Sequence, residues 1–177
     1  MINAEHANIL AIDPGKNAVG ICEYMDGEYY ASHFNPADYN EIYLYITSCC
    51  GKPPAFDFVA IEEQAYNANQ SAKLGEVYGV IKAAIQFTKI PYVEVNVQTW
   101  KSIMGFRYKK TKKADKMFYM QEANRIAPVE LKTIDEVDAF MILRAVQYAM
   151  VGNPESKVIQ GLAERLKKAV GEEVLIG

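Results

Sequence analysis

The sequence is poor in the residues that bind zinc or form disulfide bonds. Its 177 residues include three cysteines, Cys22, Cys49 and Cys50, and two histidines, His6 and His33. The cysteines show no CxxC spacing, and neither histidine stands at ligand spacing from a cysteine, so the pattern argues against a zinc site. An odd number of thiols, two of them adjacent, is typical of reduced cysteines in a cytoplasmic protein.

A long hydrophobic run is also missing. No apolar stretch approaches the roughly 20 residues that a membrane span needs. The first residues, MINAEHANILAID, lack the basic region and the apolar stretch of a secretory signal. We therefore expect a cytoplasmic protein that is neither secreted nor inserted in a membrane. A length of 177 residues, half of them hydrophobic, predicts a single domain over residues 1–177. Its core is expected at about 8–150, with a C-terminal helical extension at about 154–170.

Acidic and basic residues are unevenly distributed. The net charge is −3, yet the sixteen residues from Lys101 to Lys116 carry a net charge of +6. The cations of this basic strip are Lys101, Arg107, Lys109, Lys110, Lys112, Lys113 and Lys116. A basic strip on an acidic body is the layout expected of a protein that binds a polyanion at one place. The alternative is a solvated loop that binds nothing.

Hydrophobic periodicity predicts five strands and six helices. The strands are expected at residues 8–13, 19–24, 28–34, 58–62 and 92–97. The helices are expected at residues 38–50, 71–88, 98–104, 114–127, 134–150 and 155–169. The Asp26-Gly27 turn makes the first three strands an antiparallel meander. This order predicts an α/β fold with a mixed five-stranded sheet flanked by helices, as in the ribonuclease H-like architecture, although other mixed α/β folds share it.

Two predicted strands end in an acid that directly follows an isoleucine. These acids are Asp13, after Ile12, and Glu62, after Ile61. A carboxylate beside a core strand is unfavourable unless something pairs it. At the carboxyl end of a strand, however, it can point into a crevice where ligands bind. The alternative for either residue alone is a solvated acid at a strand end.

Two further acids lie three residues apart in the predicted helix 134–150. Asp135 and Asp138 therefore share one helix face, and Ala139 and Ile142 continue that face into the core. Acids in a first helical turn also offset the helix dipole, which is an alternative reason for Asp135. Asp138 lies nearer the packed side of the helix, so the helix dipole explains it less well.

Four carboxylates that converge from two strand ends and one helix would repel each other and shift each other's pKa. A divalent cation relieves this repulsion, and hard oxygen ligands favour Mg²⁺ or Mn²⁺ over zinc. Two such ions, about 3.5–4 Å apart, would hold the attacking water and the leaving oxygen of a phosphodiester. With no well-placed histidine or reactive cysteine, two-metal hydrolysis is the chemistry that this sequence supports best.

Four short motifs occur in an order known from one family. They are Ile12-Asp13-Pro14-Gly15 with Gly20 downstream, Ala60-Ile61-Glu62, Lys73-Leu74-Gly75 with Gly79, and Asp135-x-x-Asp138-Ala139. Each motif alone is weakly specific. Together, from about residue 9 to 150, they resemble the RuvC-type Holliday junction resolvases, also called crossover junction endodeoxyribonucleases. The short chain and its altered details resemble a phage-borne or otherwise divergent member.

The resemblance implies a ribonuclease H-like fold, a homodimer and symmetric nicking of four-way DNA junctions. It implies dependence on Mg²⁺, with two ions per site and Mn²⁺ as a substitute. Motif by motif, it makes Asp13, Glu62, Asp135 and Asp138 the catalytic metal ligands. It also implies the cytoplasm of a bacterial or phage-infected cell, and it identifies no branch-migration partner.

The resemblance further implies DNA-binding residues. Tyr66, shortly after the glutamate, matches an aromatic residue that wedges into the junction; the alternative is a core or loop tyrosine. The junction-binding lysines of the family match Lys101 and Lys113, with Lys116 close by. With the remaining cations of the basic strip, these lysines would neutralise phosphates and make DNA binding salt-dependent.

The glutamate is doubled, Glu62-Glu63, which departs from the family pattern. If Glu63 were aligned instead, the residues from Glu63 to Tyr66 (EQAY) would resemble the Glu-Gln-x-Phe of bacterial members. Neighbouring strand residues face opposite sides, so only one of the two can reach the metals. We choose Glu62 because it repeats the isoleucine-acid ending of Asp13. The segment that follows is shorter than in bacterial enzymes, which leaves the junction-sequence preference open.

The predicted helix 71–88 carries an apolar stripe that core packing explains. Its Gly75 and Gly79 would also allow the close approach of a partner helix in a two-fold dimer. Two other functions remain open. The same fold and metals could cut flaps, forks or RNA–DNA hybrids, or the chain could bind branched DNA without cutting it. The second alternative predicts at least one missing acid, and all four are present.

Overall fold

The structure is a computed structural model of the chain, and it describes residues 6–51, 56–64, 72–105, 113–153 and 155–171. In this part of the chain, five strands form one sheet in the order β3-β2-β1-β4-β5. The strands are β1 (Ile9–Pro14), β2 (Val19–Met25), β3 (Glu28–Phe34), β4 (Phe58–Glu63) and β5 (Tyr92–Asn96). β2 is antiparallel to both β1 and β3, whereas β4 is parallel to both β1 and β5. The predicted α/β fold with a mixed five-stranded sheet is confirmed.

The turn between β2 and β3 has the backbone geometry that its sequence predicts. Asp26 and Gly27 have φ values of 52° and 87°. A two-residue hairpin turn of type I′ requires this left-handed region at both positions, and aspartate and glycine are among the residues that adopt it most readily. The turn fixes the register in which Met25 pairs with Glu28.

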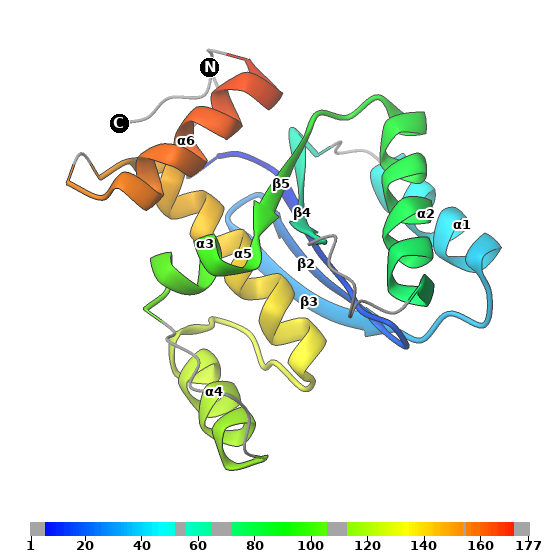
Figure 1. Ribbon diagram of the computed structural model, residues 1–177, viewed down its shortest axis with the longest axis horizontal. Helices are drawn as coiled ribbons and strands as arrows, with labels where there is room; N and C mark the ends of the chain where they lie inside the picture. The colour runs from blue at the N-terminus through cyan, green and yellow to red at the C-terminus, as the bar shows by residue number, and fades with distance from the viewer. Residues whose placement is uncertain (1–5, 52–55, 65–71, 106–112, 154, 172–177) are drawn as a thin grey trace.

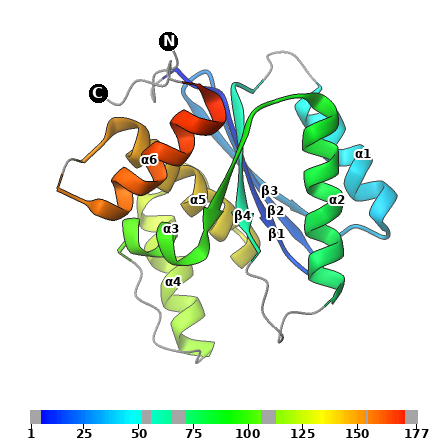
Figure 2. The ribbon, with the colours of Figure 1, turned by 45° about the horizontal axis from the view of Figure 1, so that its top comes forward.

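Helices lie on both faces of the sheet. In the described ranges they are α1 (Tyr39–Cys50), α2 (Ala72–Thr88), α3 (Val97–Ile103), α4 (Lys113–Ile126), α5 (Ile134–Val151) and α6 (Lys157–Val170). Figures 1 and 2 show α1 and α2 against one face, α3, α5 and α6 on the other, and α4 projecting away from the sheet. α6, predicted as part of a C-terminal extension, packs on α3, α5 and β5. None of the helices in these ranges is both long and apolar enough to cross a membrane.

Two helices begin at polar capping residues. Asp38 accepts a hydrogen bond from the backbone N–H of Glu41 at the start of α1. Thr133 and Glu136 form a reciprocal capping box at the start of α5. These caps pair backbone N–H groups that a first helical turn leaves without partners. The start of α5 is therefore fixed in place, and it is the part of the helix that carries two of the predicted site residues.

The central strands are buried on both faces and divide the core into two layers. Ile12 and Ile61 belong to the layer against α1 and α2, and the residue before each belongs to the layer against α5. Successive residues of a strand face opposite sides of the sheet. The residues that follow, Asp13 and Glu62, consequently face α5.

Candidate active site

Asp13 and Glu62 lie side by side at the carboxyl ends of two parallel strands. β1 and β4 pair with Ile12 opposite Ile61, which places the next residue of each strand at the same level of the sheet. Asp13 is 8 % exposed, and Glu62 is partly buried. The two strand ends thus present carboxylates to the same side of the sheet, towards the start of α5.

The start of α5 approaches this end of the sheet closely because β2 carries a glycine there. A Cβ atom added to Gly20 would lie 2.0 Å from the backbone oxygen of Asp135, so no larger residue fits without moving the helix. A Cβ atom added to Gly15 would lie 3.1 Å from Oδ1 of Asp135. That carboxylate therefore lies against the turn that follows Asp13, and Asp138 lies one turn further along α5.

Asp13, Glu62 and Asp138 all have raised pKa values. Burial is the largest cause that raises the pKa of Asp13 well above its usual value, and repulsion from the other three acids adds to it. Burial likewise raises the pKa of Glu62 to about 7 and that of Asp138 to about 6. The structure therefore brings the predicted acids together. They are called the acidic group below: Asp13, Glu62, Asp135 and Asp138.

Two buried aromatic residues donate hydrogen bonds to the acidic group. Nε1 of Trp100 donates to Oε2 of Glu62 over 2.8 Å, and the hydroxyl of Tyr119 donates to Oδ1 of Asp138 over 2.5 Å. Each donor fixes the orientation of one carboxylate. Sequence reasoning missed both residues, because each contact joins distant parts of the chain. The available signal was that Trp100 is the chain's one tryptophan and directly precedes Lys101.

Two lysines of the basic strip lie beside the acidic group. Lys101 lowers the pKa of three of the four acids, and its Nζ lies 4.9 Å from the centre of the Trp100 ring. Lys116, on α4, is exposed and lowers the pKa of Asp138. The two cations are therefore placed where they would attract a polyanion towards the acids.

The remaining predicted DNA-binding residues fall outside the described residues. They are Tyr66, Arg107, Lys109, Lys110 and Lys112. Lys113 begins α4, and its side chain is also outside the described part of the structure. Contact between these residues and DNA therefore stays a prediction.

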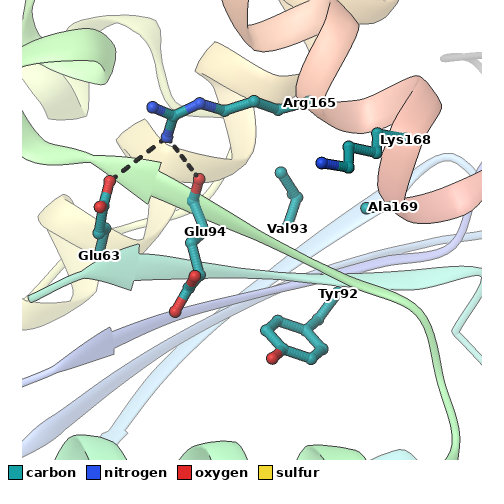
Figure 3. A pocket seen from close by; sticks show the side chains of 7 residues that line it. All are labelled: Glu63, Tyr92, Val93, Glu94, Arg165, Lys168 and Ala169. Carbon is teal, nitrogen blue, oxygen red and sulfur yellow. Dashed lines mark hydrogen bonds and ion pairs between the residues drawn. The ribbon is translucent and has the colours of Figure 1, made fainter.

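Glu63, the second of the paired glutamates, contacts α6. Nη1 of Arg165 lies 3.3 Å from Oε2 of Glu63 and donates to the backbone oxygen of Glu94 over 3.4 Å (Figure 3). These three residues line an open pocket of about 450 Å³ between β5 and α6, and none of the four acids lines it. The paired glutamates thus occupy two environments. This placement does not test the choice of Glu62 as the metal ligand, which stays a prediction.

Glu136, the third acid at the start of α5, has a different set of contacts. Its carboxylate accepts a hydrogen bond from the backbone N–H of Lys132 and lies 2.7 Å from Nδ1 of His33. Although burial opposes the effect, these contacts hold the pKa of Glu136 below its usual value. Glu136 therefore stabilises the start of α5 and its contact with β3.

The composition of the acidic group fits a divalent cation bound through oxygen. Carboxylates are the ligands that Mg²⁺ and Mn²⁺ prefer, and a charge of +2 would offset both the burial and the repulsion that raise the pKa values. Among the described residues, no three acidic, histidine or cysteine side chains are placed so as to enclose one ion. Binding would therefore draw the carboxylates closer together. Metal ligation and the number of ions remain predictions.

The sheet order β3-β2-β1-β4-β5, with a helix packed across β1 and β2, defines a ribonuclease H-like fold. Solved structures with the same fold include RuvC. Thermus thermophilus RuvC in complex with a Holliday junction substrate matches with a TM-score of 0.63 and 17 % identity, over 83 % of this chain and 97 % of that chain. A second Thermus thermophilus RuvC structure matches with a TM-score of 0.60 and 18 % identity, over 82 % and 96 % of the two chains. The predicted RuvC-like fold is confirmed.

The likeness lies in structure and not in sequence. A comparison with protein-family models finds no match, and a comparison with curated proteins finds no relative. At 17–18 % identity, the likeness to RuvC establishes the fold alone. Function therefore depends on the side chains that this chain places on that fold.

Proposed function

We propose that the protein is a divalent-metal-dependent endonuclease that resolves four-way DNA junctions. The observation that carries this proposal is the acidic group, which meets at the ends of two parallel strands and the start of α5. A protein of the same fold, Thermus thermophilus RuvC, has been solved with a Holliday junction substrate. The basic strip supports DNA as the substrate, because its net charge of +6 would hold phosphates that the acids alone would repel.

The residues of the chain would bind the metal and hold its ligands still. Two bound ions would supply an activated water and stabilise the charge on the leaving oxygen of the phosphodiester. The acidic group would hold these ions from the sheet on one side and α5 on the other. Trp100 and Tyr119 keep the carboxylates of Glu62 and Asp138 in fixed orientations. Lys101 lies beside the acids, where its charge would offset that of the substrate phosphate.

The substrate is tested by comparing a four-way junction, a fork, a flap and a linear duplex, each labelled on every strand. With Mg²⁺ or Mn²⁺, we expect paired nicks at symmetric positions in the junction and little cutting of the duplex. Equal cutting of all four DNAs would overturn the junction assignment. A preference for flaps or forks would make the protein a broader nuclease of this fold, and an RNA–DNA hybrid added as a fifth substrate tests the remaining alternative. Binding without cutting would make it a DNA-binding protein.

Asp13→Asn tests the role of the acidic group. The substitution removes one ligand charge while keeping the size of the side chain, so cleavage should be lost. Junction binding should be kept, because lysines and not the acids would contact the phosphates. Gel-shift binding and cleavage assays on the same preparation separate the two effects. A fully active Asp13→Asn variant would refute the metal assignment.

We also propose that the protein acts as a homodimer, since a two-fold dimer presents one acidic group to each of two strands of a symmetric junction. α2 offers a surface for close approach. Gly75 and Gly79 are exposed and four residues apart, with open space where a Cβ would lie. Light scattering should give twice the monomer mass of 19.9 kDa for the wild type, and Gly79→Arg should shift the protein to the monomer. A Gly79→Arg variant that is still dimeric would place the interface elsewhere.

A further inference from the structure

The first turn of α5 lies over a row of three residues, one from each of three neighbouring strands. Asp13 of β1 pairs with Gly20 of β2, and Gly20 pairs with His33 of β3. Residues that pair directly lie on the same face of a sheet. The backbone of Asp135 packs on Gly20, in the middle of this row. Asp13 and His33 therefore flank the first turn of α5, one on each side.

Glu136 joins His33 to the backbone at the start of α5. Its Oε1 lies 2.7 Å from Nδ1 of His33, and its Oε2 accepts a hydrogen bond of 2.5 Å from the backbone N–H of Lys132. The side chain of Glu136 is 4 % exposed, so these bonds are largely shielded from solvent. A carboxylate accepts and does not donate, so Nδ1 of His33 carries the hydrogen of this bond. One oxygen of Glu136 is thus bonded to the sheet and the other to the start of the helix.

The same part of α5 carries two members of the acidic group. Asp135 directly precedes Glu136, and Asp138 lies two residues after it. Oδ1 of Asp135 lies on the side of Gly15, whereas the carboxylate of Glu136 reaches the other side, towards β3. A helical turn moves as a unit, because backbone hydrogen bonds join residues four apart. A contact that fixes Glu136 against β3 therefore also fixes the positions from which the two aspartates would reach a metal ion.

Helix capping explains Glu136 but does not account for His33. The capping box of α5 needs only the side chains of Thr133 and Glu136. His33 adds a bond between strand and helix from a position 103 residues away. Further along the helix, the hydroxyl of Tyr29 on β3 donates to Oε1 of Gln147 over 2.7 Å. That second bond lies more than two helical turns from the acidic group, so the His33 bond is the one of the two that is near the predicted metal ligands.

We propose that His33 is a positioning residue that sets the metal affinity of the acidic group through Glu136. This inference rests on the proposed function. With the bond intact, the first turn of α5 is held against the sheet, and Asp135 and Asp138 keep the spacing that metal binding requires. Without the bond, that turn is freer to shift, so more of the binding free energy is needed to bring the carboxylates together. Groups that orient metal ligands directly change metal affinity by about 10- to 100-fold, and His33 acts through a second residue, so we expect about 10-fold.

The test measures Mn²⁺ binding to the DNA-free protein by isothermal titration calorimetry. His33→Ala should weaken Mn²⁺ binding by about 10-fold. His33→Asn should restore most of the affinity, because the asparagine amide can donate from nearly the position of Nδ1. The matched control is Tyr29→Phe, which removes the other bond between β3 and α5 and should leave the Mn²⁺ affinity unchanged. His6→Ala controls for the loss of an imidazole that could itself bind Mn²⁺, because His6 is the other histidine of the chain and is exposed.

A double-mutant cycle tests whether His33 acts through Glu136. In a Glu136→Ala background, His33→Ala should have little further effect on Mn²⁺ affinity, because the bond is already absent. An equal loss of affinity in both backgrounds would contradict the role of Glu136. In cleavage assays, His33→Ala should raise the Mg²⁺ concentration for half-maximal cutting by the same factor, while cutting at saturating Mg²⁺ and junction affinity stay near those of the wild type.

The outcomes distinguish this inference from the proposed function. If the wild type binds Mn²⁺ and cuts junctions while His33→Ala binds Mn²⁺ equally well, the positioning role is refuted and the nuclease stands. If Tyr29→Phe weakens Mn²⁺ binding as much as His33→Ala does, the affinity follows the general packing of β3 on α5, and the inference is overturned. A wild type that binds no Mn²⁺ would remove the metal assignment of the proposed function and this inference with it.

Discussion

Glu62 and Asp138 are each held by an aromatic side chain from a different helix. Trp100 belongs to α3 and Tyr119 to α4, and both side chains are buried. Groups that hydrogen-bond to metal ligands fix the orientation of those ligands, and their loss lowers metal affinity or activity by about 10- to 100-fold. The acidic group therefore depends on three helices and two strands, although its four carboxylates come from one helix and two strands.

Tyr119→Phe tests the hydrogen bond to Asp138, because it removes one hydroxyl and keeps the ring in place. Cleavage at limiting Mg²⁺ should fall by about 10- to 100-fold, and more Mg²⁺ should be needed for half-maximal thermal stabilisation. The matched control is Tyr30→Phe, since Tyr30 is 52 % exposed and bonds to Glu28 on β3. An unchanged Mg²⁺ dependence in Tyr119→Phe would show that the hydroxyl orients no ligand.

Glu62→Gln and Glu63→Gln should differ sharply. Glu62 belongs to the acidic group, so its substitution should abolish cleavage while leaving junction binding intact. Glu63 pairs with an exposed side chain, Arg165, and an exposed ion pair contributes only about 0.2–1 kcal/mol. Glu63→Gln should therefore lower the melting temperature slightly and remain active. An inactive Glu63 variant beside an active Glu62 variant would reverse the choice of ligand.

The convergence of the acids could be predicted from the sequence, whereas the residues that donate hydrogen bonds to them could not. Asp13 and Glu62 each end a hydrophobic run, and a run and its end are visible in a few neighbouring residues. The donors act across the fold: Trp100 reaches back 38 residues to Glu62, and Tyr119 reaches 19 residues forward to Asp138. No local pattern in the sequence encodes these two contacts.

At the scale of helices and strands, the predicted boundaries differ from the structure by a few residues, for local reasons. The strand predicted to reach Val97 ends at Asn96, because the Asn96 side chain accepts a hydrogen bond from the backbone N–H of Gln98 and caps α3. The prediction extended the strand because it used hydrophobicity alone, whereas in the structure the capping preference of asparagine ends the strand one residue earlier. The close contact between β2 and α5 was beyond prediction, because one sequence does not show which glycine faces a neighbouring backbone.

Gly20→Ala tests that contact between β2 and α5. A Cβ at this position would lie 2.0 Å from the backbone oxygen of Asp135, so the first turn of α5 must move away from the sheet. We expect a loss of about 1–3 kcal/mol in the free energy of unfolding, as for other overpacked sites. Cleavage should fall as well, because the acids of α5 move with the helix.

The control for Gly20→Ala is Gly161→Ala on α6. Nothing lies within 4 Å of a Cβ added at Gly161, and alanine in a helix interior is favoured over glycine by about 0.5–1 kcal/mol. Urea unfolding should therefore show opposite signs for the two substitutions. Equal stability of the Gly20 variant and the wild type would mean that α5 can shift without strain.

Among the described residues, the acidic group sets carboxylates into the fold, with Lys101 and Lys116 beside them. Three acids have raised pKa values because burial outweighs the lysines nearby. Charges buried in this way destabilise a fold that has no cation between them. The acidic group is thus better suited to binding metal than to stabilising the metal-free protein, and this difference can be measured.

The pH dependence of stability gives that measurement. The pKa of Glu62 rises from its ordinary value of 4.5 to about 7 on folding, and that of Asp138 from 3.8 to about 6, in both cases mainly because of burial. Between these values the folded state binds more protons than the unfolded state, so this contribution to stability is full at low pH and is lost as pH rises towards about 7. The pKa values of Glu94 and Glu136 are lowered. These two groups therefore contribute stability that is lost as the pH falls below their ordinary range.

Bound Mg²⁺ should reverse this loss, because it requires the ionised carboxylates and binds only the folded protein. The rise in melting temperature at saturating Mg²⁺ should therefore be small near about pH 5 and large near about pH 8. Glu62→Gln measures the contribution of this one carboxyl group. Without Mg²⁺, the stability of the variant should fall less steeply with rising pH than that of the wild type. With Mg²⁺, the rise in its melting temperature should be smaller. Differential scanning calorimetry of both proteins across the pH range measures each quantity. A Mg²⁺ response of equal size at both pH values would mean that the acidic group is not where the metal binds.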